Sequence, residues 1–153
     1  MAGAYTQIYI HLVFVVKGRE NLIKIENKDE LCKYITGIVQ NKGHKMIAIN
    51  GMPNHLHLLI GMKPVESLSE LVKEIKRCSS IFINDKKWTK GKFQWQSGYG
   101  AFSYSHSQIP KIANYIANQE EHHKVRTFRE EYLELLKKFN IEYDEKYIFE
   151  DVD

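Results

Sequence analysis

Residues 45–62, KMIAINGMPNHLHLLIGM, contain the pattern that decides the fold. Two short apolar segments, 45–50 and 54–62, flank Gly51 and Pro53, which are strong turn-forming residues. We therefore expect two consecutive strands joined by a tight connection. Strands joined so closely pair in an antiparallel fashion, so this stretch predicts an antiparallel sheet.

The segments on either side extend this pair into a strand–helix–strand–strand–helix–strand order. Alternating apolar residues predict a strand over residues 8–16, and an irregular strand interrupted by glycines is expected within residues 93–105. Apolar residues at helical spacing predict four helices. The first helix is capped by Asn27 or Asp29 and runs to about Asn41, and the second is capped by Ser67 or Ser69. The other two helices span residues 108–124 and 126–139.

This order is the split βαβ, ferredoxin-like arrangement of an α+β protein. It predicts an antiparallel sheet with helices on one face, plus a C-terminal helix that carries Tyr115. We divide the chain into one domain, residues 1–140, and an acidic C-terminal tail, residues 141–153. Because this fold hosts many activities, the function has to be argued from particular residues.

Composition is typical of a single globular domain. The chain has 153 residues, of which 43% are hydrophobic and 27% charged. No apolar run approaches the roughly 20 residues of a membrane span, and no basic segment precedes residues 8–16 as it would in a secretion signal. Cys32 and Cys78 are too few for a disulfide framework. We therefore expect free thiols and a cytoplasmic protein.

Charge is unevenly distributed along the chain. Residues 120–153 have six Lys/Arg and eleven Asp/Glu, which leaves a net charge of +8 on residues 1–119 of a chain whose formal net charge is +3. A basic body is compatible with a polyanionic partner, although a solvated surface would give the same excess.

Two histidines lie two residues apart in the strand at 54–62. Side chains alternate across a strand, so His55 and His57 share one face while Leu56, Leu58 and Ile60 point to the other, which we expect to be the core. Same-face neighbours are about 7 Å apart at their Cα atoms. Two imidazoles at that spacing can converge on one metal ion. Two histidines on a partly wet sheet face would give the same pattern, so both interpretations stay open.

The helix expected at residues 108–124 offers further donors. Tyr115 and Gln119 are four residues apart and are therefore neighbours on its polar side. The Gln119 oxygen could complete a His/His/Gln metal site, and the Tyr115 hydroxyl could attack a group that the metal polarises. The alternative is a plain amphipathic helix with a tyrosine at the edge of its apolar face.

Several motifs occur together in the order and spacing of a known family. They are HLH at 55–57, HLVFVVKGREN at 11–21, LSELVKEIKRCSSIFIN at 68–84, FQWQSGYGAFSYS at 93–105 and IANYIANQEEHH at 112–123. With them, nearly the whole chain resembles the HUH-type single-tyrosine transposases of the insertion-sequence 200 class, which are related to the REP-associated tyrosine transposases. Asn54 departs from the pattern, because family members often have Asp before the first histidine.

The resemblance implies a DNA transposase that cleaves and rejoins single-stranded DNA. Tyr115 would form a 5′-phosphotyrosine, and His55, His57 and Gln119 would hold a divalent ion, Mg²⁺ or Mn²⁺. The implied partners are single-stranded DNA with hairpin ends and a second copy of the chain in a homodimer, with or without exchange of the tyrosine helices. The turn at 105–110 would then be the hinge.

Basic and aromatic residues outside this site are candidates for DNA contacts, because Lys and Arg hold phosphates and aromatic rings stack on unpaired bases. They are Lys17, Arg19, Lys73, Lys76, Arg77, Lys87 and Trp88. Two other classes of function remain open: a non-catalytic nucleic-acid-binding module on a ferredoxin-like fold, and a small metal-binding domain without nucleic acid. Convergence of Tyr115 with both imidazoles would favour the enzyme.

Overall fold

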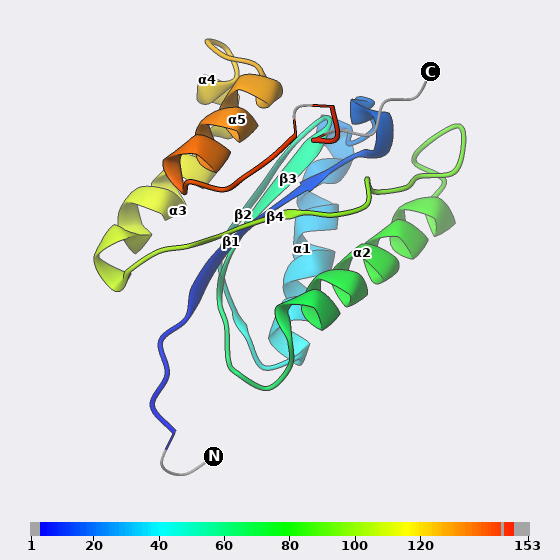
Figure 1. Cartoon of the computed structure of the whole chain (residues 1–153). Coiled ribbons are helices and arrows are strands. Elements are labelled where there is room, and N and C mark those ends of the chain that lie inside the picture. The colour runs from blue at the N-terminus through cyan, green and yellow to red at the C-terminus, as the bar shows by residue number, and fades with distance from the viewer. Residues whose placement is uncertain (1–3, 145, 149–153) are drawn as a thin grey trace.

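The sheet has four antiparallel strands in the order β2-β3-β1-β4. The computed structural model describes residues 4–144 and 146–148. Figure 1 shows the sheet between two groups of helices. The strands are β1 (Tyr9–Val15), β2 (Lys45–Met52), β3 (His55–Gly61) and β4 (Gly100–Ser103). This strand order is that of the split βαβ arrangement, so the predicted ferredoxin-like fold is confirmed.

The predicted hairpin is confirmed, and it fixes the position of the histidines. Strands β2 and β3 pair in a register that sets Met52 opposite His55 and Asn50 opposite His57. On its other side β3 pairs with β1, where Val13 lies opposite His57. The histidine strand is therefore central in the sheet, held by hydrogen bonds on both edges.

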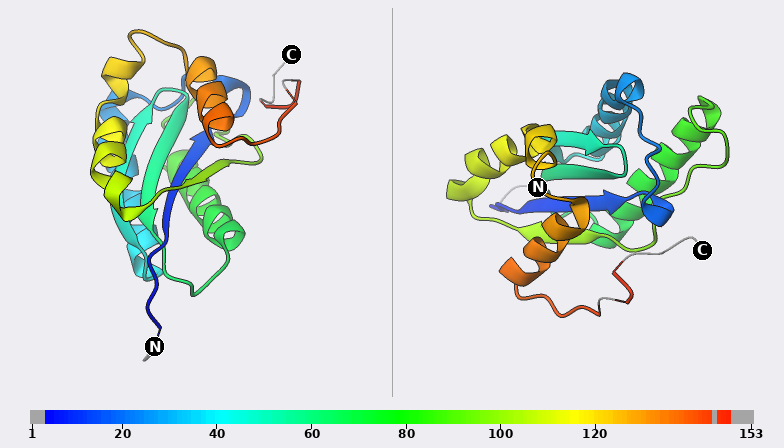
Figure 2. Two further views of the ribbon diagram at one scale, coloured as in Figure 1. Left: turned by 60° about the vertical axis from the view of Figure 1, so that its left-hand side comes forward. Right: turned by 90° about the horizontal axis from the view of Figure 1, so that it is seen from above.

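One face of the sheet is covered by α1 (Ile25–Asn41) and α2 (Leu68–Asp85), as the views in Figure 2 make clear. Leu56, Leu58 and Ile60 are fully buried in this core, as predicted. Helix α2 begins as expected, because the side chain of Ser67 accepts a hydrogen bond from the amide of Glu70.

The predicted start of the first helix is wrong. Helix α1 begins at Ile25, and its N-cap residue Lys24 makes no side-chain capping bond, so Asn27 and Asp29 lie inside the helix instead of capping it. Packing of Leu31, Ile35 and Val39 against the core places this helix without a cap.

The opposite face of the sheet carries α3 (Ile109–Ala117), α4 (Gln119–His122) and α5 (Phe128–Lys138). The helix expected over residues 108–124 is interrupted, because Asn118 leaves the helical conformation (φ −102°, ψ 28°). Short 3-10 turns at Lys17–Arg19 and His106–Gln108 complete the regular structure. A second core, separate from the first, lies between these helices and the sheet and includes Val13, Leu59 and Ile116.

The chain after α5 returns towards the body of the protein. Tyr143 and Ile148 pack against the second core, and the Gln96 side chain donates a hydrogen bond to the carbonyl of Ile148 at 3.0 Å. Residues 145 and 149–153 of the expected acidic tail lie outside the described residues, and the division at residue 140 stays a prediction. Cys32 and Cys78 are free thiols, as expected. Among the described helices, none has the length and apolar character needed to cross a membrane.

Candidate active site

Each of the two histidines of β3 contacts a neighbouring side chain through its Nδ1 atom. The Nδ1 atom of His55 lies 2.7 Å from the side-chain oxygen of Asn54, and that of His57 lies 2.8 Å from Nε2 of His11 on β1. Both imidazoles are almost completely buried, with 1% and 0% exposure. The partly wet sheet face considered as the alternative is thus excluded. Each ring presents Nε2 to the space between β3 and the helices that follow it.

Gln119 enters this space from the first residue of α4. Its Oε1 lies 3.5 Å from Nε2 of His55, while its side-chain nitrogen is buried without a hydrogen-bond partner in the described structure. The end of α3 is fixed from the sheet, because the side chain of Asn50 donates to the carbonyls of Ile116 and Ala117 at 2.9 and 3.3 Å. This contact places the helix break, and hence Gln119, over the histidine strand.

Tyr115 reaches the same space from α3. Its ring meets that of His57 edge-on at 6.1 Å and stacks on His122 at 4.6 Å between centroids. Its hydroxyl donates to Oε2 of Glu131 and accepts from the guanidinium of Arg126 at 3.2 Å. The structure therefore brings Tyr115, His55, His57 and Gln119 together within one chain.

Helix α5 places Glu131 at the centre of this cluster, a residue that was not predicted from the sequence. Its Oε1 lies 3.1 Å from Nε2 of His57, 3.6 Å from Nε2 of His55 and 3.2 Å from Nε2 of His123. The side chain is fully buried. A signal for it exists in the sequence, because Glu131 lies on the apolar stripe of α5 between Phe128 and Leu135, where an acidic residue is rarely found unpaired.

His123 and His11 were also missed as parts of the site. Nε2 of His123 lies 3.1 Å from Oε1 of Gln119, so it links α4 with Glu131. The sequence places His11 on the same face of β1 as Val13 and Val15, but only strand register reveals that it meets His57.

The donor atoms fit a divalent cation. Those of His55, His57 and Glu131 all lie within 4.8 Å of one another. Bonds of about 2.1 Å in an octahedron set neighbouring donors roughly 3 Å apart, which is close to the separations of 3.1–3.6 Å in this cluster. Imidazole nitrogens combined with carboxylate and amide oxygens suit several divalent metals. This buried group could therefore bind a metal ion.

Burial and charge set the protonation states in the cluster. Burial lowers the pKa of His55 and of His11 well below the usual value, so both rings are neutral. Burial opposes ionisation of Glu131, but hydrogen bonds from His123, His57 and Tyr115 outweigh it and lower the pKa of this carboxyl. Burial and the charge of Glu131 raise the pKa of Tyr115, so its phenol stays protonated.

Comparison with known proteins decides the family. The family model described as "Transposase IS200 like" matches residues 4–119, which is most of the chain. The chain belongs to this family. The ISDra2 transposase TnpA of Deinococcus radiodurans is 28% identical over 126 residues, covering 78% of this chain and 89% of that protein. The predicted class and a role as a DNA-processing transposase are confirmed.

Two solved structures are similar to this transposase. A candidate transposase from Deinococcus radiodurans R1 has 25% sequence identity and a TM-score of 0.63, and the match covers 78% of this chain and 95% of that chain. A REP-associated tyrosine transposase bound to a REP hairpin has 15% identity and a TM-score of 0.57, with 80% and 74% coverage, which shows a shared fold. The family model ends at Gln119, so Arg126 and Glu131 lie beyond the matched region.

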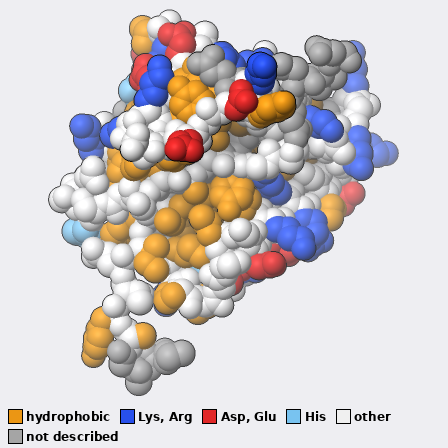
Figure 3. All heavy atoms as spheres, viewed as in Figure 1, with side chains coloured by type: hydrophobic (Ala, Val, Ile, Leu, Met, Phe, Trp, Pro, Cys, Tyr) orange, Lys and Arg blue, Asp and Glu red, His pale blue; other side chains and the backbone are white. Residues whose placement is uncertain are grey.

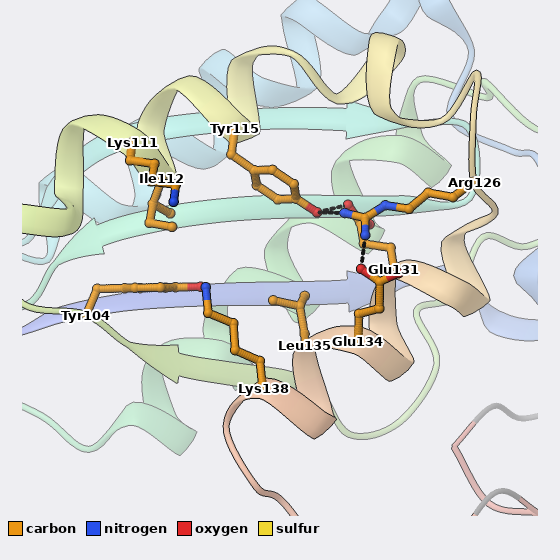
Figure 4. Close-up of a pocket in the computed structure, with 9 residues that line it drawn as sticks. All are labelled: Tyr104, Lys111, Ile112, Tyr115, Arg126, Glu131, Glu134, Leu135 and Lys138. Atoms are coloured by element: carbon orange, nitrogen blue, oxygen red, sulfur yellow. Dashed lines mark hydrogen bonds and ion pairs between the residues drawn. The ribbon is translucent and has the colours of Figure 1, made fainter.

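A cavity of about 290 Å³ opens beside the Tyr115 hydroxyl of this transposase, between α3 and α5. Figure 4 shows Tyr115 pointing from α3 towards Arg126 and Glu131 at one end of it, with Lys111, Tyr104 and Lys138 at the other. The Lys138 ammonium lies 5.8 Å from the centre of the Tyr104 ring. In the described structure neither Lys111 nor Lys138 has a carboxylate partner.

The residues expected to contact DNA lie away from the tyrosine. Lys17, Lys76 and Arg77 line an open groove of about 530 Å³ between α2 and residues 92–97. Lys76 is engaged there, because its ammonium donates to the carbonyls of Gln96 and Gly98. Arg77 forms an ion pair with Glu74 at 2.8 Å.

The remaining candidates are separate from that groove. Trp88 is partly buried, and its ring meets Phe82 edge-on at 5.4 Å, so part of its surface supports the core. Lys73 and Lys87 are exposed, and Arg19 is half-buried in the turn after β1. Basic side chains are dispersed over the face seen in Figure 3, where hydrophobic side chains gather near its centre.

Proposed function

We propose that this transposase cleaves and rejoins single-stranded DNA, with Tyr115 as nucleophile and a divalent cation held by His55, His57 and Gln119. The observation that supports this most is that one carboxylate joins the two groups within one chain. Oε1 of Glu131 lies 3.1 and 3.6 Å from the Nε2 atoms of His57 and His55, and Oε2 accepts the hydrogen bond of the Tyr115 hydroxyl. Gln119 Oε1 lies 3.5 Å from Nε2 of His55. A binding module or a plain metal-binding domain would need no tyrosine beside the histidine pair. The relative bound to a REP hairpin supports DNA with hairpin ends as the substrate.

The proposed reaction exchanges one phosphodiester for another. The Tyr115 oxygen bonds to phosphorus, and the bond to the 3′ oxygen of the preceding nucleotide breaks. The phenol loses its proton and the departing 3′ oxygen gains one, which leaves a 5′-phosphotyrosine and a free 3′-hydroxyl. Because a phosphodiester is replaced by a similar diester, the reverse step can rejoin strands without ATP.

The residues around Tyr115 have distinct roles in this proposal. A bound Mg²⁺ or Mn²⁺ would neutralise charge on the phosphate oxygens, and imidazole ligands favour Mn²⁺ somewhat. Arg126, at 3.2 Å from the Tyr115 oxygen, stabilises negative charge as the phenol deprotonates. This help is needed, because burial and Glu131 raise the pKa of Tyr115 in the free protein.

The cavity beside Tyr115 is the proposed entry for the DNA strand to be cut. Lys111 and Lys138 lie along its wall and can each contact a backbone phosphate. The groove that Lys17 and Arg77 line is suited to a second stretch of backbone, such as a hairpin stem. Lys76, by contrast, is better explained as a structural residue that holds residues 96–98.

A homodimer remains part of the proposal. Since Tyr115 meets the histidines of its own chain, the arrangement supports a site assembled within one subunit rather than one with exchanged tyrosine helices. Mixing Tyr115→Phe and His57→Ala subunits distinguishes the two arrangements. An exchanged dimer regains cleavage in the mixture, whereas sites assembled within one subunit stay inactive.

The direct test is incubation of the full chain with hairpin-bearing single-stranded DNA and Mn²⁺, followed by a denaturing gel. A covalent protein–DNA species is expected for the wild type and none for Tyr115→Phe. Tyr34→Phe is the matched control, because Tyr34 lies on α1, where its ring stacks on Phe82 far from the site. A covalent species with Tyr115→Phe would reject Tyr115 as the nucleophile, and no covalent species with the wild type would favour the binding module.

A further inference from the structure

Helix α5 adds a carboxylate to a donor set whose other members are two imidazoles and an amide. Neutral imidazoles and the Gln119 amide would leave the charge of a buried divalent cation uncompensated, which is costly in a medium of low dielectric constant. Glu131 supplies a carboxylate in this fully buried position. It lies on the part of the chain that the family model does not match.

The two oxygens of Glu131 face different partners. Oε1 lies 3.1 and 3.6 Å from the Nε2 atoms of His57 and His55, which are the separations of neighbouring ligands around one ion. Oε2 accepts the hydrogen bond from the Tyr115 hydroxyl. One rigid carboxylate thus spans the space between the histidine pair and the nucleophile.

We propose that Glu131 is a further ligand of the divalent cation through Oε1 and at the same time positions Tyr115 through Oε2. Helix α5 then couples metal binding to the placement of the nucleophile. The role rests on the proposed function, since it assumes that the histidine pair holds the cation and that Tyr115 attacks.

The position of α5 supports this coupling. Phe128, three residues before Glu131, stacks on the ring of His55 with 3.9 Å between centroids. Tyr132, the next residue, is packed against Gly100 of β4, where an added Cβ would lie 2.8 Å from its ring. The carboxylate is therefore carried by a helix that contacts both the histidine strand and the edge strand, which limits its movement.

Metal affinity tests the first half of the proposal without DNA. Mn²⁺ is titrated into the full chain, and the free ion is followed by electron paramagnetic resonance. Glu131→Gln keeps the side-chain shape and is expected to weaken Mn²⁺ binding by about tenfold or more. Glu121→Gln is the control, because Glu121 is exposed on α4 and pairs with Lys124, and it should leave the affinity unchanged. Wild-type affinity in Glu131→Gln would overturn the proposal.

A second variant, His57→Ala, shows whether a negative result rejects the role of Glu131 alone or the whole proposed metal site. If His57→Ala binds Mn²⁺ as well as the wild type, the metal site itself is wrongly assigned. If His57→Ala loses binding while Glu131→Gln keeps it, only the role of Glu131 fails.

The second half of the proposal is tested at saturating Mn²⁺. If Glu131 acted on the metal alone, excess Mn²⁺ would restore the rate of covalent adduct formation in Glu131→Gln. Because Glu131 also positions Tyr115, the rate should stay about tenfold or more below that of the wild type, as expected for a misplaced nucleophile. Full recovery would limit Glu131 to metal binding and reject the positioning role.

A measurement on the wild type covers the case in which Glu131→Gln fails to fold. Crystals of the full chain soaked in Mn²⁺ should give an anomalous peak about 2.2 Å from Oε1 of Glu131, with the Tyr115 oxygen still in hydrogen-bond range of Oε2. A peak bound to both histidines but without a bond to Glu131 would overturn the proposal.

Discussion

Nε2 of His11 lies 2.8 Å from Nδ1 of His57, and both imidazoles are completely buried. A neutral imidazole can bind a metal through Nε2 only when its proton is on Nδ1. His57 then donates to His11, whose own proton must be on the Nδ1 atom that has no partner within the described residues. His11 can therefore accept the Nδ1 proton of His57 and support the form of His57 that binds a cation through Nε2.

We predict that His11→Phe weakens Mn²⁺ binding by about tenfold or more while the protein stays folded, since loss of such a supporting bond typically costs 10–100-fold in metal affinity. Phenylalanine preserves the ring but cannot accept the proton of His57. The Mn²⁺ titration measures the effect. His106→Phe, which changes an exposed histidine bonded to Tyr9, serves as control. Equal affinity for His11→Phe and the wild type would show that His57 does not depend on His11.

We predict that His57→Ala abolishes metal-dependent cleavage, because it removes one of the two buried imidazoles that face the site. Cleavage of labelled hairpin-bearing DNA across a Mn²⁺ titration provides the measurement. If this variant cleaves as the wild type does at every Mn²⁺ concentration, His57 has no place in the site.

The lysines of the cavity should contribute to DNA affinity. In a Tyr115→Phe background, which prevents covalent trapping, Lys111→Ala with Lys138→Ala should weaken binding of single-stranded DNA. The dependence of log affinity on log salt should also become shallower by about 0.7 for each phosphate that a lysine no longer neutralises. Lys137→Ala is the control, because Lys137 is an exposed residue of α5, next to Lys138, that does not line the cavity. If Lys137→Ala has an effect as large as the double variant, net charge and not the cavity explains the binding.

The docking of α5 should depend on Gly100. A Cβ at this position would lie 2.8 and 2.9 Å from the ring and hydroxyl of Tyr132, so Gly100→Ala should destabilise the fold by about 1–3 kcal/mol. Gly37 of α1 has open space around it, and Gly37→Ala should stabilise by roughly 0.5–1 kcal/mol. Chemical denaturation measures both. Equal stability of Gly100→Ala and the wild type would contradict the tight packing of α5 on β4.

The sequence was sufficient to predict those parts of the site that depend on local geometry. Alternation along β3 put His55 and His57 on one face, and helical spacing put Gln119 beside Tyr115. That proximity survives the break at Asn118, whose amide still bonds to the carbonyls of Asn114 and Tyr115. The strand–turn–strand pattern at 45–62 likewise predicted the hairpin and its antiparallel pairing.

Residues that enter the site through tertiary packing could not be predicted in this way. His11 meets His57 only because β1 pairs with β3 in one register. Glu131 arrives on a helix whose position depends on a second core. The true start of α1 was missed for a similar reason, because burial of its apolar stripe fixes the helix where a capping side chain was expected.

Mass-spectrometric mapping of the covalent adduct tests the central claim most directly. The wild-type chain is incubated with hairpin-bearing single-stranded DNA and Mn²⁺, digested, and the modified peptide and attached DNA end are identified. We predict a 5′-phosphate bonded to Tyr115, with a free 3′-hydroxyl on the released strand. Attachment to another residue, attachment through a 3′-phosphate, or cleavage with no covalent species would contradict this account.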